Sequence, residues 1–208
     1  MDARRLAKLC LHAAARGTVA PVVAAYKLEL ALWPAARHDL VFQTYSQVLS
    51  ALPGLSGQYL RRAFYASALA ECHPDTCIQW GTVFSSPLAR LAQGVYVGAR
   101  CMLGRVVLEE HVTLGSNIDI PSGRNQHGTD DPDVPIQDQP GRFETVRIGR
   151  NTWVGNGAVI LADVGARCLV AAGAVVSAPV PDDVVVGGNP ARVLRRRDPV
   201  TKQWVKAT

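Results

Sequence analysis

One histidine in this sequence stands in a setting that suits proton-transfer chemistry. His127 lies in the run SGRNQHG, Ser122 to Gly128, at the root of a segment rich in proline, glycine and aspartate, residues 121–147. A histidine near neutral pH can take the proton from a hydroxyl group that attacks a carbonyl carbon. Most lone histidines are ordinary surface groups, and those at 12, 38, 73 and 111 have no comparable setting. We therefore predict that His127 is a catalytic base.

A six-residue repeat flanks this segment on both sides. Aliphatic residues recur in steps of six, with one step of five and one of four, and a compact residue often follows four positions later. The aliphatic series is Val97, Leu103, Leu108, Leu114, Ile148, Val154, Ile160, Val164, Val170 and Val176. The compact series is Cys101, Val112, Thr152, Ala158, Cys168 and Ala174. A loop that interrupts such a repeat is usually functional, because the scaffold gains nothing from it.

Neither a helix nor a single long strand explains a period of six. Around a helix, Ile148, Val154 and Ile160 would lie about 120° apart on three different faces. The glycines that follow the aliphatic residues would weaken the interior of one long strand. A coil with three short sides per turn, one hexapeptide on each side, directs every aliphatic residue to a common axis. The sequence therefore predicts a mainly β protein, with a parallel β-helix over residues 76–190 and an active-site loop inserted at 121–147.

The chain outside the repeats comprises a helical region, residues 1–75, and a C-terminal tail, residues 191–208. Apolar residues at helical spacing predict three helices, at 22–33, 40–52 and 57–69. Pro21 and Pro34 bracket the first, and Asp39 and Ser56 are the predicted N-caps of the second and third. We expect the helices to cover the open first coil. The alternative is an amphipathic surface that docks on a membrane.

Composition restricts the class of protein. The chain has 208 residues, 48% of them hydrophobic, which is enough for a substantial core. No apolar run reaches the roughly 18 residues that span a bilayer, and Lys8 and His12 leave the N-terminus without the clean apolar core of a secretory signal. We expect a cytoplasmic protein, with peripheral contact at the inner membrane as an alternative. The net charge of +5 comes without a nucleic-acid-binding motif, so we expect no nucleic-acid partner. The five cysteines lack metal-site spacing, and we expect no metal.

The repeat region, residues 78–197, resembles the hexapeptide-repeat acyltransferases, whose β-helices are left-handed. The runs IGRNTWVGNGAVILADVG and VVVGGNPARVL are similar to the C-terminal signature of that family. SGRNQHG resembles the loop that carries its essential histidine. The similarity is greatest to bacterial O-acetyltransferases of surface-polysaccharide synthesis, and it extends to sugar, xenobiotic and serine acetyltransferases.

This resemblance implies a function and a set of site residues. It implies an O-acetyltransferase that uses acetyl-CoA, forms a homotrimer with active sites between neighbouring subunits, and modifies a hydroxyl of a sugar or glycan. The implied cofactor contacts are Trp153, Asn156, Ala172, Ser177, Ala178, Arg192 and Arg195. The implied substrate-loop residues are Ser122, Asn125 and Gln126.

Other functions remain open at this point. The acceptor could be a small natural product or an antibiotic. The chain could be a non-catalytic β-helix scaffold. A zinc carbonic anhydrase shares the β-helix, but it needs three histidines across a subunit interface, and only His111 and His127 lie in suitable places here.

Overall fold

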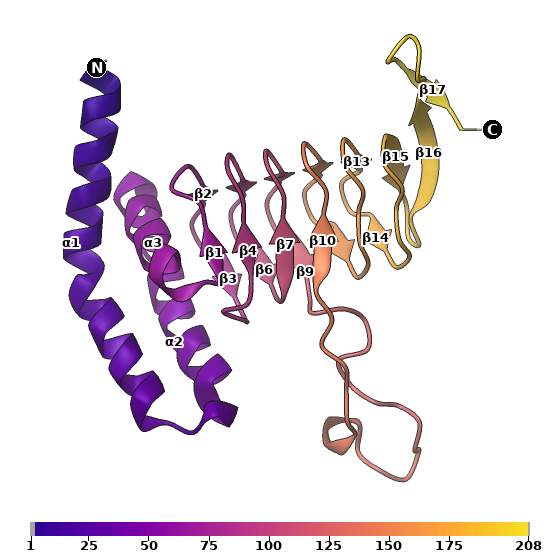
Figure 1. Cartoon of the computed structure of the whole chain (residues 1–208). Coiled ribbons are helices and arrows are strands. Elements are labelled where there is room, and N and C mark those ends of the chain that lie inside the picture. Colours follow the sequence, from indigo (N-terminus) through magenta and orange to yellow (C-terminus); the bar gives the residue numbers. More distant parts are fainter. Residues whose placement is uncertain (1–2, 208) are drawn as a thin grey trace.

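A computed structural model describes residues 3–207 and shows a helical region stacked on one end of a parallel β-solenoid (Figure 1). The described helices are α1 (Ala3–Leu32), α2 (His38–Ser50) and α3 (Gly54–Ala68), with a short 3-10 helix, η1 (Ala35–Arg37), between the first two. The solenoid has about six turns. The predicted mainly β class, a parallel β-helix preceded by helices, is confirmed.

Three sheets form the sides of the solenoid, and each coil up to Ile160 contributes one short strand to each sheet, whereas the next coil adds only the bridge residue Val164 to the first of them. Sheet A contains β1 (Glu71–Cys72), β4 (Arg90–Leu91), β7 (Val106–Leu108) and β10 (Val146–Ile148). Sheet B contains β2 (Cys77–Ile78), β5 (Tyr96–Val97), β8 (Thr113–Leu114), β11 (Trp153–Val154), β13 (Leu169–Val170), β15 (Val184–Gly187), β16 (Arg192–Arg197) and β17 (Trp204–Lys206). Sheet C contains β3 (Val83–Phe84), β6 (Met102–Leu103), β9 (Asp119–Ile120), β12 (Val159–Ile160) and β14 (Val175–Val176).

The predicted aliphatic series forms a buried column along the solenoid. In sheet B, Val97, Leu114 and Val154 lie in register on successive parallel strands, and all ten members of the series are buried. The short step to Val164 is accommodated because that residue pairs through isolated bridges with Ile148 and Val180. The six compact residues are buried as well. The hexapeptide period therefore identifies the core of the solenoid correctly.

Polar groups of the helices bond the free backbone edge of the first coil. The Ser46 hydroxyl of α2 accepts a hydrogen bond from the Phe84 backbone N–H at 2.9 Å, and the Ser50 carbonyl accepts one from Gly81 at 2.9 Å. The Tyr65 hydroxyl of α3 lies 2.7 Å from the same Ser46 oxygen. An unpaired backbone N–H at a buried sheet edge would cost the free energy of a lost hydrogen bond. The helical region therefore closes the end of the solenoid, as expected.

Arg61 of α3 is a fully buried cation at this junction. Its guanidinium donates to the backbone carbonyls of Ile78, Leu49 and Leu52. Burial lowers the pKa of this group. The carbonyl oxygens replace water around the charge, so Arg61 joins β2 to the C-terminal end of α2.

The helix boundaries differ from those predicted. α1 runs through Pro21 for 30 residues, although a proline removes the hydrogen bond to the carbonyl of Gly17. Tertiary packing outweighs this loss, because buried residues of α1 on both sides of Pro21 contact the core. Asp39 lies in the first turn of α2, where its carboxylate interacts favourably with the helix dipole but makes no N-cap hydrogen bond. Ser56 lies inside α3, which begins at Gly54. The predicted N-caps were wrong.

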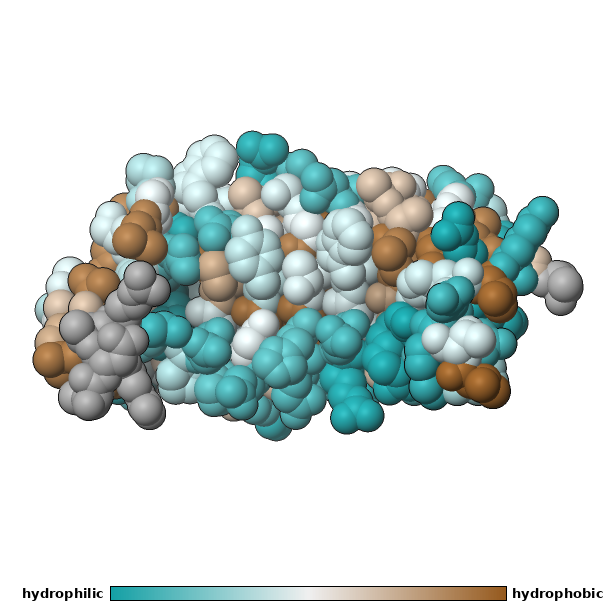
Figure 2. All heavy atoms as spheres, turned by 90° about the horizontal axis from the view of Figure 1, so that it is seen from above, coloured by the Kyte–Doolittle hydropathy of each residue, from teal (hydrophilic) through white to brown (hydrophobic). Residues whose placement is uncertain are grey.

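α1 is also apolar over most of its length. By length and composition alone, Leu6–Leu32 could cross a membrane, with a mean hydropathy of 1.2 and 17% of its best window buried. Core helices of soluble proteins and signal sequences meet the same criterion. Figure 2, seen from above, shows apolar surface at the helical end and again at the opposite end, with a more polar face between them.

The C-terminal end of the solenoid is covered by the chain itself. β16 pairs antiparallel with β15, and β17 pairs antiparallel with β16, so sheet B ends in a hairpin (Figure 1). The segment between β15 and β16 crosses over to sheet C, where Val175 donates to the Gly188 carbonyl at 3.0 Å and accepts from Ala191 at 2.8 Å. The two ends of the solenoid are thus closed by different means.

Candidate active site

The inserted loop, residues 121–147, leaves the solenoid at the corner between sheets C and A and projects away from it (Figure 1). It contains one short 3-10 helix, η2 (Ile136–Asp138). Backbone bonds close its neck: Arg142 donates to the Asn125 carbonyl at 2.6 Å, and Glu144 donates to the Ser122 carbonyl at 2.9 Å. The neck therefore holds the two limbs of the loop side by side.

Two glycines allow these limbs to approach each other. A Cβ on Gly141 would overlap the carbonyl of Gln126 and lie 2.8 Å from the backbone nitrogen of His127. A Cβ on Gly128 would lie 2.7 Å from the carbonyl oxygen of Pro140. Both distances are shorter than a side-chain carbon ordinarily makes with backbone atoms. The position of His127 therefore depends on glycine at positions 128 and 141.

His127 lies in a hollow of about 380 Å³ formed between the two limbs. Its imidazole is exposed, and no other group within residues 3–207 makes a hydrogen bond to it. Asp130 and Arg142 bring one charge of each sign to the same hollow. The lining residues are Asn125, His127, Gly128, Thr129, Asp130, Pro140, Gly141 and Arg142. The ring nitrogens are therefore accessible to a hydroxyl group that enters from solvent.

A second hollow, of about 500 Å³, adjoins the first, because Asn125 lines both. Arg124 spans the second hollow, and its guanidinium donates to the Ser177 carbonyl at 3.5 Å. The lining residues are Arg124, Asn125, Glu144, Thr145, Val146, Leu161, Ala162, Asp163, Ser177, Ala178 and Pro179. The fold thus brings the loop against Ser177 and Ala178, two predicted cofactor residues, of which Ser177 lies 53 positions after Arg124 in the chain.

Three other predicted cofactor residues lie elsewhere on the chain. Trp153 is on β11 in sheet B and is 54% exposed. Asn156 and Ala172 occupy the corner between sheets B and C on successive coils, where the Asn156 carbonyl accepts from Gly173 at 2.9 Å. The Asn156 side chain also accepts from the Ser116 N–H at 2.8 Å. A single chain therefore does not bring these residues into the His127 hollow.

The predicted arginines lie at the far end of sheet B. Arg192 and Arg195 are both on β16, and both are exposed. The ion pairs found among residues 3–207 engage neither of them. Their charges are therefore available to an anionic ligand along this edge.

Two of the predicted substrate-loop residues fasten the loop. Ser122 is buried, and its hydroxyl accepts the Arg105 N–H at 2.9 Å. The Gln126 side-chain amide donates to the Gly123 carbonyl at 3.3 Å. Of the three predicted substrate-loop residues, only Asn125 lines the hollows.

Sequence reasoning did not single out Arg124, Asp130 or Arg142. Asp130 is three positions from His127, so its proximity was readable from the sequence. Arg142 and the contact of Arg124 with Ser177 depend on how the loop folds back, which the sequence pattern does not show. Within residues 3–207, no group of three or more His, Cys, Asp or Glu side chains could hold a metal ion.

Comparison with known proteins identifies sequence relatives. No protein-family model matches the chain. A relative from Escherichia coli K12, named as the lipopolysaccharide biosynthesis O-acetyl transferase WbbJ, is 24% identical over 174 residues, 71% of this chain and 89% of the relative. The Saccharomyces cerevisiae protein YJL218W, named as an acetyltransferase, is 38% identical over 66 residues. That match spans 29% of this chain and only 34% of the yeast protein.

Solved structures share the fold. A maltose O-acetyltransferase from Clostridium difficile superposes with a TM-score of 0.65 at 17% identity, over 76% of this chain and 87% of that one. The hexapeptide-repeat acetyltransferase VCA0836 from Vibrio cholerae has a TM-score of 0.57 at 21% identity, over 78% and 94%. The N-acyltransferase AntD from Bacillus cereus, in complex with dTDP and coenzyme A, has a TM-score of 0.51 at 15% identity, over 60% and 72%. With the sequence relatives, this fold confirms the resemblance to the hexapeptide-repeat acyltransferases.

Proposed function

We propose that this chain is an acetyl-CoA-dependent O-acetyltransferase that modifies a hydroxyl of a sugar or glycan in bacterial surface-polysaccharide synthesis. The acyltransferase class is supported by the relatives, and the name of the Escherichia coli relative favours a glycan acceptor. The observation that carries the proposal is the junction of two hollows at Asn125. It places an accessible histidine beside the corner of the solenoid that holds Ser177 and Ala178.

A homotrimer belongs to the proposal. The His127 loop leaves the corner between sheets C and A, whereas Asn156 and Ala172 occupy the corner between sheets B and C. The three sheets make the solenoid a three-sided prism, and these are two different corners of it. At each corner, a single chain therefore supplies only one half of the proposed site. Three prisms packed side by side could bring the B and C corner of one copy against the loop of the next.

The residues present suit coenzyme A. Its phosphates need cations, and the hollow beside Ser177 does not supply a positive excess, because it holds Glu144 and Asp163 against Arg124. Arg192 and Arg195 on β16 supply exposed guanidinium groups, which match phosphate oxygens in geometry. We therefore assign the nucleotide end to β16 and the acyl end to His127. AntD, which shares the fold, was solved with coenzyme A bound.

His127 acts as the general base in this mechanism. Acetyl-CoA, when bound, supplies an acetyl group activated as a thioester. His127 takes the proton of the acceptor hydroxyl while that oxygen forms a bond to the acetyl carbon. As the carbon–sulfur bond breaks, the protonated imidazole returns the proton to the leaving sulfur. A backbone N–H of the coil stabilises the charge that develops on the carbonyl oxygen.

Direct transfer is favoured over an acyl-cysteine route. The reactive form of a cysteine is the thiolate, which a low pKa favours. Burial raises the pKa of the Cys101 and Cys168 thiols, and the inserted loop contains no cysteine. All five cysteines lie within residues 3–207 and are free, which suits the cytoplasmic location that we include in the proposal.

Release of coenzyme A from acetyl-CoA, measured with a panel of glycan and natural-product hydroxyls, tests this proposal. We expect His127→Ala to lower turnover by about 10²- to 10⁴-fold, the usual contribution of a general base, with acetyl-CoA binding retained. His111→Asn is the matched control, because asparagine tolerates the left-handed φ of 59° at that position.

The outcomes separate the alternatives. Turnover by His127→Ala at the wild-type rate would exclude this residue as the base. Failure of the wild-type protein to bind acetyl-CoA would favour the scaffold function. Zinc bound to the wild-type protein and lost in His111→Asn, with no release of coenzyme A by either protein, would favour the carbonic anhydrase.

A further inference from the structure

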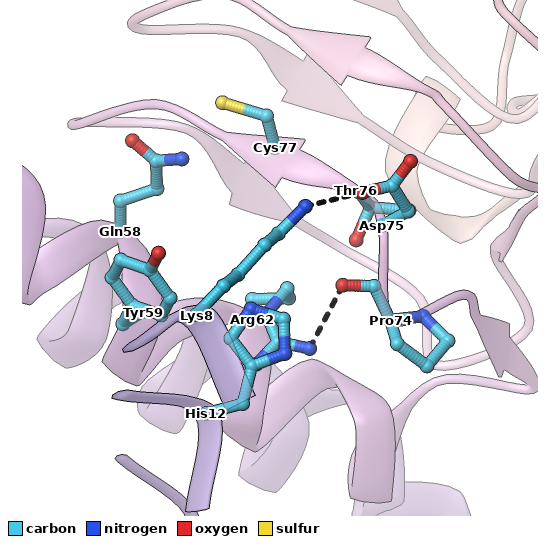
Figure 3. Close-up of a pocket in the computed structure, with 9 residues that line it drawn as sticks. All are labelled: Lys8, His12, Gln58, Tyr59, Arg62, Pro74, Asp75, Thr76 and Cys77. Carbon is cyan, nitrogen blue, oxygen red and sulfur yellow. Dashed lines mark hydrogen bonds and ion pairs between the residues drawn. The ribbon is translucent and has the colours of Figure 1, made fainter. Parts of the chain in front are cut away.

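A separate cavity lies where α1 and α3 meet the first coil of the solenoid (Figure 3). In Figure 1 the N-terminal part of α1 and the inserted loop lie on opposite sides of the solenoid, so this cavity is distinct from the His127 hollow. Its volume is about 190 Å³. The lining residues are Lys8, His12, Gln58, Tyr59, Arg62, Pro74, Asp75, Thr76 and Cys77.

Arg62 is the residue that requires an explanation. It is 6% exposed, and one guanidinium nitrogen, Nη1, donates to the Pro74 carbonyl at 3.1 Å. The other, Nη2, is buried and has no hydrogen-bond partner within residues 3–207. No carboxylate in that part of the chain lies within 4.0 Å of the guanidinium. A buried charged donor without a partner is costly, so this nitrogen is suited to an anionic acceptor.

The groups around Arg62 leave the cavity with a positive excess. Asp75 is the only carboxylate among the lining residues, and Lys8 Nζ already donates to its Oδ1 at 2.6 Å, the interaction drawn as a dashed line from Lys8 in Figure 3. That pair is neutral, so the charge of Arg62 is not compensated. Burial lowers the pKa of Arg62, because desolvation disfavours the charged form of the guanidinium. An anion in the cavity would reverse that effect.

His12 adds a second group suited to an anion. Its ring packs edge-on against Tyr59, with 5.2 Å between ring centroids, and it lies beside Arg62 in Figure 3. Burial lowers the pKa of His12, and the charges of Arg62 and Lys8 lower it further. The imidazole can donate one N–H without carrying a full charge. The amide of Gln58 and the hydroxyl of Thr76 border the same space.

The size of the cavity restricts the ligand. Pockets for drug-sized molecules measure about 300–1,000 Å³, and this one, at about 190 Å³, is smaller. A coenzyme or a sugar nucleotide does not fit. A phosphate group does, and its oxygens match the paired nitrogens of a guanidinium.

We infer that this cavity binds a phosphate group, with Arg62 as the principal ligand and His12 and Lys8 as supporting residues. Two sources present the same chemistry: free phosphate or a small phosphate ester, and the headgroup of an anionic lipid. Exposed leucines of α1, Leu6, Leu9 and Leu11, lie next to the cavity residues in sequence and would face a lipid surface in the second case. The inference does not depend on His127 or on acetyl-CoA.

Calorimetry and thermal unfolding without acetyl-CoA test the inference. The probes are sodium phosphate and, separately, phosphatidylcholine vesicles with and without phosphatidic acid. Wild type should bind one probe and gain stability that rises with the logarithm of the probe concentration once the site is saturated. Arg62→Met and Lys8→Gln should each weaken binding by at least about tenfold, the second because it leaves Asp75 unpaired. Lys27→Gln is the control, because it removes an exposed charge from the same helix away from the cavity.

Each outcome of these binding experiments either supports the phosphate site or overturns it. Binding of free phosphate with this pattern of variants supports the site and assigns a soluble ligand. Binding only of vesicles that contain phosphatidic acid, with the same pattern, supports the site and assigns a lipid headgroup. If Arg62→Met does not fold, Lys8→Gln decides alone. Absence of binding to both probes, or equal binding by wild type and Lys8→Gln, overturns the inference.

Discussion

The solenoid and its inserted loop are built on opposite principles. In the solenoid, each inward aliphatic residue of the series is buried, and the strands inside each sheet bond to the strands above and below them. In the loop, residues 123–145, most side chains are exposed, and a few neck bonds and two glycine contacts hold its shape. The solenoid therefore contributes most of the stability of this part of the fold, whereas the loop leaves polar side chains accessible to a ligand. A substitution in the core of the solenoid should therefore change stability, and a substitution in the loop should change activity with little effect on stability.

The largest effect is expected in the core of the solenoid. Leu103 on β6 is fully buried, so Leu103→Ala should lower the free energy of unfolding by about 2–5 kcal/mol through lost burial and the cavity it leaves. Met102 is next to it on the same strand and is 51% exposed, so Met102→Ala should cost much less. Urea unfolding measures both. Equal losses would show that the buried column does not dominate stability.

A smaller effect, on activity rather than on stability, is expected in the loop. Gly141→Ala places a carbon against the backbone of Gln126 and His127, so the two limbs must separate. We expect turnover to fall by at least about tenfold, or about 1.4 kcal/mol in the activation free energy, because the base is displaced. The urea midpoint should change little, since no strand of the solenoid moves. Retained turnover would show that the neck does not set the position of His127.

The smallest effect is expected in the helical region and is stabilising. Gly17 lies inside α1, and a Cβ there would meet no atom within 4 Å other than the adjacent backbone of its own helix. Gly17→Ala should raise the free energy of unfolding by about 0.5–1 kcal/mol, because alanine restricts the unfolded chain and favours a helix. Thermal unfolding checks this, and the same variant is the glycine-to-alanine control for Gly141. A lower melting temperature would show that α1 contacts a neighbour at this point.

The comparison also explains what the sequence could predict. The hexapeptide period is a local signal repeated many times, so every residue of its two series between Val97 and Val176 is buried, although it did not single out the buried Val106, Ile118, Ile120 and Val146. The helix ends depended on single capping residues, and packing of α1 outweighed the signal of Pro21. The loop was found as an interruption, but the contact of Arg124 with Ser177 arises from a fold-back with no sequence period. The cavity at Arg62 joins residues from three elements, and no motif marked it.

The closed ends of the solenoid have a consequence for assembly. A bare coil at either end would offer unpaired backbone groups to another chain, and copies could then stack into an open-ended fibre. Here the serines of α2 bond one end, and the hairpin of β16 and β17 with the crossover at Val175 covers the other. The edges of β3 at one end and of β14 and β15 at the other are thus bonded within the chain, which disfavours stacking of copies at these strands. The trimer that we propose would instead form along the sides of the solenoid.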